Sequence, residues 1–325
     1  MVIAKKLRKN SGVMVVSPSR SLSFVPESVI DIAKNNIESI YGLKVLFSKN
    51  SYALNKWDSS SVEERVEDLE SAFEDNSINC ILSSIGGYNT NQLLEHINWD
   101  LIKRNPKILC GYSDITVLLN AFYAKTKIIS YYGPNFSTFG QKYLDSFTKE
   151  FFKKCLFYSE EFNIKPSQKY SEDKWYIDQE DRKNLKNPGL TVIKEGESEG
   201  ILLGGDLSTF NLLRGTKYMP DLTDSVLLIE DRNIAQIFDR DLEALISTSG
   251  FEKVKGILIG RFESKTDITE STLKEIIKSK KYIKDIPVVF GLDFGHTDPK
   301  LTLPIGGKIS LSVKENNCLI KVLNH

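Results

Sequence analysis

The chain contains few groups that could act as a base near neutral pH or bind a metal ion. Only three of its 325 residues are histidines, His96, His296 and His325, and no two of them stand at the spacing of a metal-binding helix or finger. The four cysteines include no CxxC pair, so the pattern favours neither a zinc knuckle nor a redox dithiol. We therefore expect no metal site, and a general base must come from very few residues.

Net charge and long apolar runs are also missing. Acidic and basic side chains balance at 43 each, which leaves no global electrostatic reason to expect nucleic acid or an anionic membrane as a partner. No apolar run approaches the roughly 18 to 20 residues of a membrane-spanning helix. The basic start of the chain leads into a short strand-like run and not into a signal-peptide core. We expect a cytoplasmic protein that binds neither nucleic acid nor a membrane.

The first part of the chain alternates regularly between strand and helix patterns. Strand-like runs and stretches with helical apolar spacing follow one another in this order: 12–18, 26–42, 43–50, 60–78, 79–87, 89–106, 107–114 and 115–125. Such alternation predicts right-handed crossovers and a mostly parallel sheet flanked by helices. In sheets of this kind, functional groups gather beyond the carboxyl ends of the strands.

The sequence changes character beyond about residue 140. Residues 159–189 are polar, contain scattered aromatic residues and show little periodicity, which is typical of a linker or a long surface loop. Short strand-like runs and two helical stretches follow. We predict an α/β protein with an N-terminal domain over 1–165, a linker or substrate loop over 166–190, and a smaller, β-rich α/β domain of the swivelling type over 191–325.

Four glycine-containing corners follow strand-like runs, at residues 84–90, 109–114, 202–209 and 292–299. None of them fits a phosphate-binding fingerprint, because neither GxGxxG nor GxxxxGK[ST] occurs at a strand-to-helix turn. We expect no cofactor. The class of chemistry that remains is nucleophilic catalysis by a serine, with histidine and a carboxylate supplied from elsewhere in the chain.

The corner at 109–114 contains Ser113, between a strand pattern and a helix pattern. A strand that turns abruptly into a helix holds its turn residue in a strained, exposed position, which makes Ser113 a candidate nucleophile. The alternative is structural, because serine is a favoured helix N-cap and an aspartate such as Asp114 is favourable in a first helical turn. Both interpretations fit this stretch.

His296 is the best candidate for the base. It follows a strand-like run and a glycine, whereas His96 falls in a helical pattern and His325 is the last residue, where we expect fraying. Glu230 ends the apolar run of residues 224–230 and is the candidate for the orienting carboxylate. Asp231 is its rival, since only one of two adjacent strand residues faces a given side.

A set of longer motifs resembles the LD-carboxypeptidase family of serine peptidases, and within it the microcin C self-immunity (MccF-type) branch. The motifs are IGGYNTNQLL, PKILCGYSDITVLLNAFYAKT, YYGP, GILLGGDLSTFNLLRGT, LLIEDRN and GHTDPKLTLPIGG, in the family's order over nearly the whole chain. The resemblance implies a nucleophile at Ser113, a carboxylate at Glu230 and a base at His296. It also implies an oxyanion hole formed by the backbone N–H groups of Gly87 and Asp114.

The resemblance implies two classes of substrate. Family members cleave the amide between an L- and a D-residue of murein tetrapeptides, and the immunity branch cleaves the amide that joins a peptide or aminoacyl group to a sulfamoyl- or phosphoramidate-nucleotide. The GHTDP and GRF motifs favour the second class. We expect Gly86 and Trp175 to contact the substrate. Trp175 offers a ring that would stack on a base, worth about 1 to 3 kcal/mol, or would instead anchor its loop.

The sequence also leaves the oligomeric state and two other classes of protein to consider. Relatives in the family are commonly homodimers, so the resemblance favours a homodimer that acts on a small-molecule substrate. A different class of protein remains open, a non-catalytic module that binds a nucleotide or a peptide and uses Ser113 only as a cap. A cysteine hydrolase based on Cys110 is a weaker alternative, because this residue lies within an apolar strand and should point into the sheet.

Overall fold

The strand patterns of the first part of the chain form one sheet in the computed structural model, which describes residues 1–314 and 317–325. Its strands are β1 (Gly12–Val16), β2 (Lys44–Phe47), β3 (Ile78–Ser83), β4 (Ile108–Gly111), β5 (Ser130–Tyr132) and β14 (Leu303–Ile305). They lie in the order β14-β5-β4-β3-β1-β2, and of the pairs described only β14 with β5 is antiparallel. The prediction of a mostly parallel N-terminal sheet is confirmed.

A second, mixed sheet is built from the later part of the chain. Its strands are β6 (Phe162–Ile164), β9 (Thr191–Lys194), β10 (Gly196–Asp206), β11 (Ser225–Glu230), β12 (Gly256–Gly260), β13 (Val288–Leu292), β15 (Lys308–Lys314) and β16 (Asn317–Asn324). The order is β6-β16-β15-β10-β11-β12-β13-β9, with β10 to β13 parallel to one another. Two short strands, β7 (Lys169–Tyr170) and β8 (Leu185–Lys186), pair separately. The α/β class is therefore confirmed in both parts of the chain.

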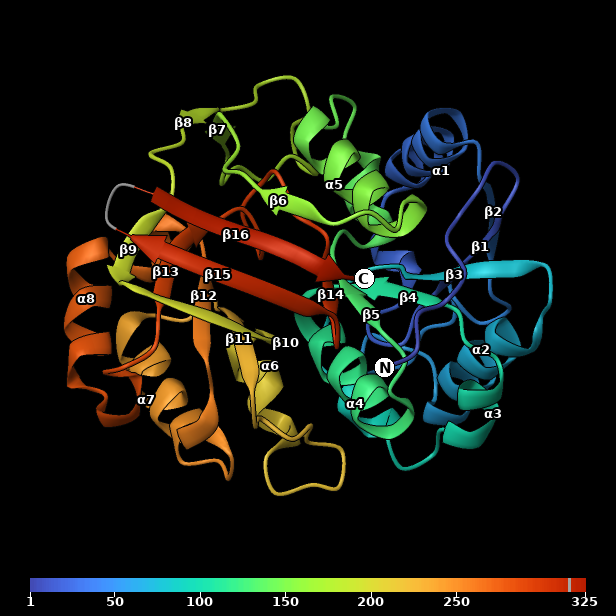
Figure 1. Ribbon diagram of the computed structural model, residues 1–325. Coiled ribbons are helices and arrows are strands. Elements are labelled where there is room, and N and C mark those ends of the chain that lie inside the picture. The colour runs from blue at the N-terminus through green and yellow to red at the C-terminus, as the bar shows by residue number, and fades with distance from the viewer. Residues whose placement is uncertain (315–316) are drawn as a thin grey trace.

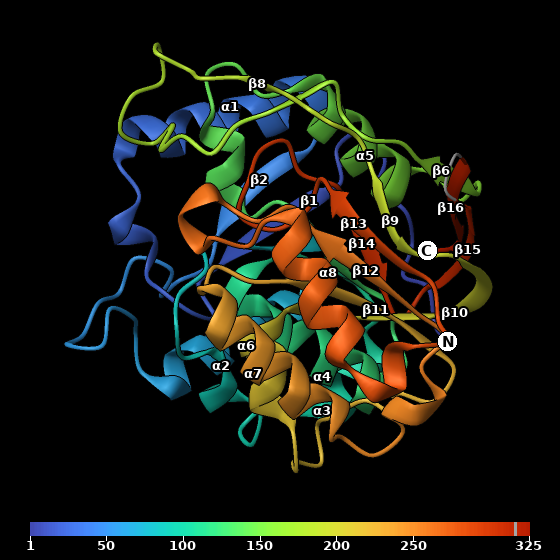
Figure 2. The ribbon, with the colours of Figure 1, turned by 90° about the vertical axis from the view of Figure 1, so that its left-hand side faces the viewer.

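Helices flank the two sheets, which lie side by side in Figure 1. They are α1 (Glu27–Tyr41), α2 (Val62–Glu74), α3 (Trp99–Arg104), α4 (Thr116–Thr126), α5 (Ser146–Phe157), α6 (Leu207–Phe210), α7 (Ala235–Ile246) and α8 (Glu270–Ser279). Figure 2 shows α7 and α8 in front of the second sheet. Within the described residues, no helix is long and apolar enough to cross a membrane.

Local sequence signals set several helix ends. Helix α1 stops at Gly42, which adopts the left-handed conformation with φ of 67° that glycine tolerates best. Helix α2 begins with a capping box, in which Ser61 accepts from the backbone N–H of Glu64 and the Glu64 carboxylate accepts from the N–H of Ser61. These ends agree with the predicted boundaries.

The helix predicted over 89–106 is wrong in its middle. The chain forms a 3-10 turn at Thr90–Leu93 and then helix α3, which starts only after Asn98. The Asn98 side chain accepts a hydrogen bond from the N–H of Leu101 and so begins a new helix. His96 therefore lies in an exposed turn between the two segments, not on a helix.

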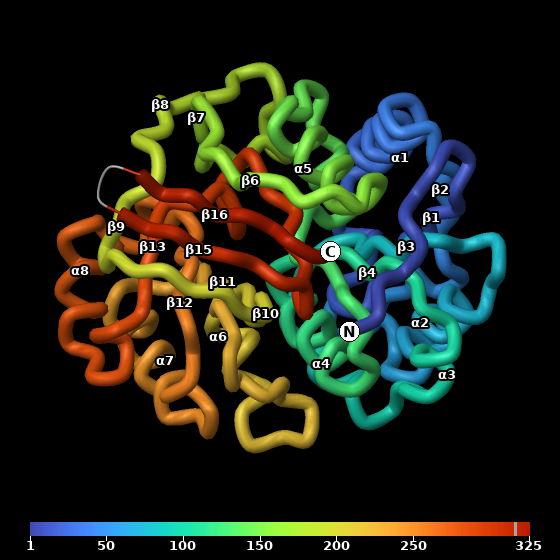
Figure 3. Tube along the Cα trace, viewed as in Figure 1, coloured from blue at the N-terminus to red at the C-terminus, as the bar shows by residue number. Residues whose placement is uncertain are grey.

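The two parts of the chain exchange strands and bring the termini together. Strand β14 pairs with β5 in the first sheet, and β6 pairs with β16 in the second. Figure 3 traces both ends of the chain to one region, where Lys6 Nζ lies 2.8 Å from His325 Nδ1. The expected fraying of His325 is wrong, because its buried ring also contacts the carbonyls of Cys155 and Glu160. The bounds of the predicted domains stay a prediction.

Candidate active site

Ser113 occupies a strained corner between strand β4 and helix α4. The strand ends at Gly111, and Ser113 opens a 3-10 turn over Ser113–Ile115 with φ of 63°, a value that non-glycine residues rarely adopt. No side chain caps this turn or helix α4, so the alternative of Ser113 as an N-cap is wrong. The corner instead directs the hydroxyl towards the second sheet.

The hydroxyl of Ser113 begins a hydrogen-bonded chain that joins the two sheets. His296 Nε2 lies 3.1 Å from Ser113 Oγ, and His296 Nδ1 lies 2.9 Å from Glu230 Oε2. The Tyr132 hydroxyl donates to the other carboxylate oxygen, Glu230 Oε1, at 2.6 Å. The three residues singled out from the sequence thus meet, although 183 positions separate Ser113 from His296.

The strands explain why these side chains meet. Ser113 follows β4, Glu230 is the last residue of β11, and His296 follows β13, so all three lie beyond the carboxyl ends of parallel strands. Every residue of β11 is buried, as expected for a strand covered on both faces, and Glu230 is 1% exposed. The carboxylate therefore has fixed protein partners and little contact with water.

Burial sets the protonation preferences of the pair. It raises the pKa of Glu230 to about 7, against the opposing hydrogen bond from Tyr132 and the positive charge of Lys300. Burial also lowers the pKa of His296 below that of a free imidazole. In the resting site the imidazole is thus kept neutral, the form that can accept a proton from a hydroxyl.

The rival carboxylate, Asp231, makes other contacts. It is buried, but its Oδ1 atom accepts from the backbone N–H and the side-chain amide of Asn233, at 2.8 and 2.7 Å. Glu230, and not Asp231, bonds His296. Glu230 ends β11 and Asp231 directly follows it, so the side chains of these adjacent residues leave the chain in different directions.

Asp206 is a further buried carboxylate that the sequence analysis did not single out. It ends β10 and caps α6, accepting from the N–H of Thr209 at 2.9 Å. One ligand atom each of Asp206, Glu230 and His296 lies within 4.8 Å of the others, the spacing of a metal-binding group. Glu230 and His296 already bond each other, so an ion there would have to break that hydrogen bond. The glycine corner at 202–209 was the available signal for this residue.

Of the two glycines of the IGG corner, Gly86 lies beside the nucleophile and Gly87 packs against Ser19 and Arg20. A Cβ atom on Gly86 would stand 3.1 Å from Ser113 Oγ. A Cβ on Gly87 would stand 2.3 Å from Ser19 Oγ and 2.9 Å from the backbone nitrogen of Arg20, which is closer than real Cβ atoms approach. Only glycine fits at residue 87 without moving its neighbours.

The Asp114 side chain holds this corner against the nucleophile turn. Its Oδ2 atom accepts from Ser19 Oγ at 2.5 Å, and from the Oγ1 and N–H of Thr90 at 2.6 and 3.0 Å. Its backbone N–H, like that of Gly87, donates to no acceptor within residues 1–314 and 317–325. Both N–H groups are therefore left unoccupied by these parts of the chain.

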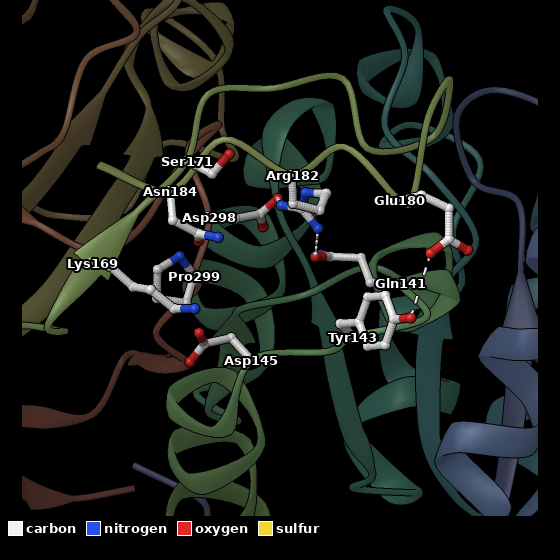
Figure 4. Close-up of a pocket in the computed structure, with 10 residues that line it drawn as sticks. All are labelled: Gln141, Tyr143, Asp145, Lys169, Ser171, Glu180, Arg182, Asn184, Asp298 and Pro299. Atoms are coloured by element: carbon white, nitrogen blue, oxygen red, sulfur yellow. Dashed lines mark hydrogen bonds and ion pairs between the residues drawn. The ribbon is translucent and has the colours of Figure 1, made fainter. Parts of the chain in front are cut away.

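Trp175 lies in the predicted substrate loop over 166–190. It packs half-buried against the core, and its ring meets Tyr176 edge-on with a centroid distance of 5.9 Å. Its contacts fit the interpretation as a loop anchor, while part of the ring stays exposed. Trp175 does not line the pocket of Figure 4, a cavity of about 260 Å³ beneath the same loop.

That pocket has charged walls. Figure 4 shows Arg182 from the loop beside Gln141 and Asp298, and Glu180 from the loop beside Tyr143; Arg182 donates to Gln141 Oε1 at 2.9 Å. A bridge between Ser171 and Asp298 joins the loop to the turn that contains His296. The loop is thus attached directly to the residues that follow the imidazole.

A single buried carboxylate holds both ends of the loop. Asp293 accepts from Ser167 at one end and from the Asn187 side chain at the other, at 2.7 and 3.0 Å. Arg261, from the GRF motif, donates to Asn187 Oδ1 at 2.7 Å and lies over the Tyr170 ring. Asp293 therefore joins the two ends of the loop, although the strands that flank it, β6 and β9, form opposite edges of the second sheet.

Cys110 is enclosed within β4 and does not face the site. It is 0% exposed, and burial raises the pKa of its thiol well above the usual value. A buried thiol of this kind is a poor nucleophile. Its surroundings argue against the cysteine alternative.

Two family models match the chain. They are described as the LD-carboxypeptidase N-terminal domain, which matches residues 13–133, and the LD-carboxypeptidase C-terminal domain, which matches residues 199–311. The chain belongs to the LD-carboxypeptidase family. It is accordingly a serine hydrolase, and the family that the sequence motifs suggested is confirmed.

Named relatives cover nearly the whole LD-carboxypeptidase chain. YocD of Bacillus subtilis, provisionally designated a carboxypeptidase, is 43% identical over 324 residues, 99% of each chain. A Treponema pallidum protein of the same provisional designation is 45% identical over 315 residues, 96% of this chain and 93% of that one. The microcin C7 self-immunity protein MccF of Escherichia coli is 34% identical over 291 residues, 86% of this chain and 84% of MccF.

Solved structures in the same family share the fold. An MccF-like protein of Bacillus anthracis superposes with a TM-score of 0.98 at 40% identity, over 100% of both chains. MccF in complex with glutamyl sulfamoyl guanosine superposes with a TM-score of 0.90 at 29% identity, over 100% of this chain and 99% of that one. These LD-carboxypeptidase relatives thus include one whose ligand joins an amino acid to a nucleoside.

Proposed function

We propose that the protein is an amidase in which Ser113 attacks an amide carbonyl. The observation that carries this proposal is the continuous contact from Ser113 Oγ through His296 to Glu230, at 3.1 and 2.9 Å. His296 Nε2 would take the hydroxyl proton and then deliver it to the leaving amine, which leaves an acyl group on Ser113. A water activated by the same imidazole would release the acid. Glu230 would fix the tautomer of His296 and stabilise the imidazolium.

The oxyanion of the tetrahedral intermediate requires preorganised donors. The backbone N–H groups of Gly87 and Asp114 are the proposed pair, supported by their lack of acceptors in the described parts of the chain and by the approach of the IGG corner to Ser113. Each such donor is typically worth about 10² to 10³ in rate. A pure binding module would have no use for this combination of donors, base and nucleophile.

As substrate we propose peptidyl- or aminoacyl-nucleotides of the microcin C type, so that hydrolysis of their amide gives self-immunity or detoxification. The match to MccF, whose solved complex contains glutamyl sulfamoyl guanosine, supports this choice. The exposed part of the Trp175 ring would stack on the base, and Gly86 would line the acyl side of the site. The small-molecule substrate would enter beneath the loop of residues 166–190, between domains over 1–165 and 191–325.

A second candidate function is the removal of terminal D-Ala from murein tetrapeptides. The carboxypeptidase designation of the two relatives at 43% and 45% identity favours it. Both functions use the same nucleophile and differ only in the groups on either side of the amide. Substrate binding beyond the scissile bond therefore separates them.

The deciding experiment incubates the protein with an aminoacyl-sulfamoyl adenosine and, separately, with a murein tetrapeptide, and follows both reactions by mass spectrometry. We expect cleavage of the aminoacyl-sulfamoyl adenosine and no cleavage by the Ser113→Ala variant. Cleavage of the tetrapeptide alone would establish the second function instead. Hydrolysis of neither compound, with tight binding of one, would favour a non-catalytic module.

We also propose that the protein is a homodimer in the cytoplasm, as its resemblance to the family implied. Size-exclusion chromatography with light scattering tests the oligomeric state directly. A mass near twice 36.8 kDa would support a dimer, and a mass near 36.8 kDa would contradict it.

A further inference from the structure

Lys300 is a buried lysine beneath the turn that contains His296, and the proposed mechanism does not use it. The residue is 4% exposed. Its Nζ atom donates to the carbonyls of Gly295 and Thr297, each at 2.9 Å. These carbonyls belong to the residues immediately before and after His296, so one ammonium group binds the backbone on both sides of the imidazole.

The same ammonium group also contacts the nucleophile corner. It lies 4.7 Å from the centroid of the Tyr112 ring, the residue directly before Ser113. The Tyr112 ring in turn meets the His296 ring edge-on, with centroids 5.5 Å apart. Lys300 Nζ is also 3.3 Å from Asp298 Oδ1, which helps to offset the cost of burying its charge. Lys300 therefore touches both halves of the site at once.

We propose that Lys300 is a positioning residue, whose ammonium group holds the His296 turn in register with the Ser113 corner. The inference rests on the proposed function, because it assumes that His296 is the base for Ser113. Placement matters at this scale, since a displacement of about 1 Å at a reacting group can cost about 10² in rate.

The charge of Lys300 gives the proposal a measurable signature. The charged groups that act on His296 from the surrounding elements are Glu230, Asp206, Arg232, Glu263 and Lys300. Burial is the main cause of the lowered pKa of His296, and Arg232 and Lys300 lower it further, while Asp206 and Glu263 raise it. Removal of the Lys300 charge should therefore raise the pKa of His296.

Lys107 provides a matched control. It is also a buried lysine, 9% exposed, whose ammonium group donates to two backbone carbonyls, those of Ala72 and Asp75. It precedes strand β4, while Ser113 follows that strand, so it lies at the opposite end. The Lys107→Met variant loses the same kind of contact without touching the site.

The test measures the rate at which a fluorophosphonate labels Ser113 as a function of pH, together with the melting temperature of each variant. For Lys300→Met we expect a labelling rate about 10² lower than wild type and a midpoint of the acid limb at higher pH. For Lys300→Gln, which keeps a donor but not the charge, we expect the same direction of shift with a smaller loss of rate. Lys107→Met should lower only the melting temperature.

The outcomes separate this inference from the proposed function. If the acid limb of Lys300→Gln and Lys300→Met has the same midpoint as that of wild type, the positioning role is overturned. Labelling of the wild type at Ser113 would still support the nucleophile in that case. An equal shift in Lys107→Met would also overturn it, since the effect would then be one of general stability. Failure of the wild type to react would instead refute the nucleophile and the positioning role together.

Discussion

The Ser113 corner and the His296 turn bring their side chains to the same point by different means. The corner is local, because strand β4 runs directly into a 3-10 turn and helix α4, and Ser113 takes a φ of 63° between them. The His296 turn lies outside the strands and helices described. A distant contact holds it, from Glu230 on β11, together with a local one, from the buried ammonium group of Lys300 in the same stretch of chain.

This difference teaches where each half of the site is vulnerable. A change at the corner alters the reacting atom or the donors next to it, so it should act on the rate alone. A change among the contacts of the His296 turn should act through the position and protonation of the ring, and so through the pH dependence as well.

The largest effect should come from the reacting atom itself. Ser113→Ala removes the hydroxyl 3.1 Å from His296 Nε2 and should lower kcat by about 10⁴ to 10⁶, measured as the rate of amide hydrolysis. Cys110→Ala is the control and should keep the wild-type rate within about twofold, because the thiol is enclosed in the sheet. The reverse pattern, activity lost with Cys110 and retained without Ser113, would revive the cysteine hydrolase.

The next largest effect is expected at Glu230, the carboxylate that bonds His296. Glu230→Gln should lower kcat by about 10⁴, since the amide cannot fix the required tautomer of His296 or stabilise the imidazolium. The neighbouring substitution Asp231→Asn should change kcat by less than about tenfold, because Asp231 bonds Asn233 and not the imidazole. Steady-state kinetics of the two variants test the assignment of Glu230 as the orienting carboxylate. A greater loss of kcat in Asp231→Asn than in Glu230→Gln would contradict it.

A smaller effect is expected at Gly87 of the IGG corner, whose backbone N–H is a proposed oxyanion donor. Gly87→Ala places a Cβ 2.9 Å from the backbone nitrogen of Arg20, so the loop must shift and the proposed donor moves with it, at a cost of about 10² to 10³ in kcat. Gly215→Ala is the control, because no atom lies within 4 Å of its Cβ position although its φ is 73°. It should lower the melting temperature without changing kcat, and equal losses in both variants would contradict the donor role.

The smallest effect concerns stability. Burial raises the pKa of Asp231 from its ordinary value of 3.8 to about 7, so the stability that the protonated form contributes is complete below the ordinary pKa and is lost as the pH rises through 7. Asp231→Asn removes the buried charge that forms above that range. We expect its melting temperature to exceed that of wild type by about 2 °C or more at pH 8 and to match it at about pH 3.5, below the pKa of the unfolded carboxyl group. A gain that is equal at both pH values would contradict this account.

The same contrast explains how much of the fold and of the site could be predicted from the sequence. Ser113 could be found because a strand-to-helix corner is a local pattern, and the parallel order of strands up to β5 follows from local alternation. His296 and Glu230 were also at predicted strand ends. Asp206, Tyr132 and Lys300 were not assigned roles, since the contacts of Asp206 and Tyr132 with the triad and of Lys300 with Tyr112 depend on how the second sheet approaches the first. No local spacing encodes that approach.

The predicted helix over 89–106 failed for a local reason that was visible only in part. Asn98 competes with the continuing helix by capping α3, and the apolar spacing on either side hides that break. The expected fraying of His325 was wrong for a long-range reason. Lys6 and the Cys155 carbonyl, which are far away in the sequence, enclose this last residue.

The central claim is that the hydroxyl of residue 113 is the group that attacks, activated by the imidazole of residue 296. The most direct test is to treat the protein with a fluorophosphonate, digest it and locate the adduct by mass spectrometry. We expect one phosphonylated peptide, with the added mass on Ser113 and none in the His296→Ala variant over the same time. An adduct on another serine, or undiminished labelling of Ser113 without His296, would contradict the account.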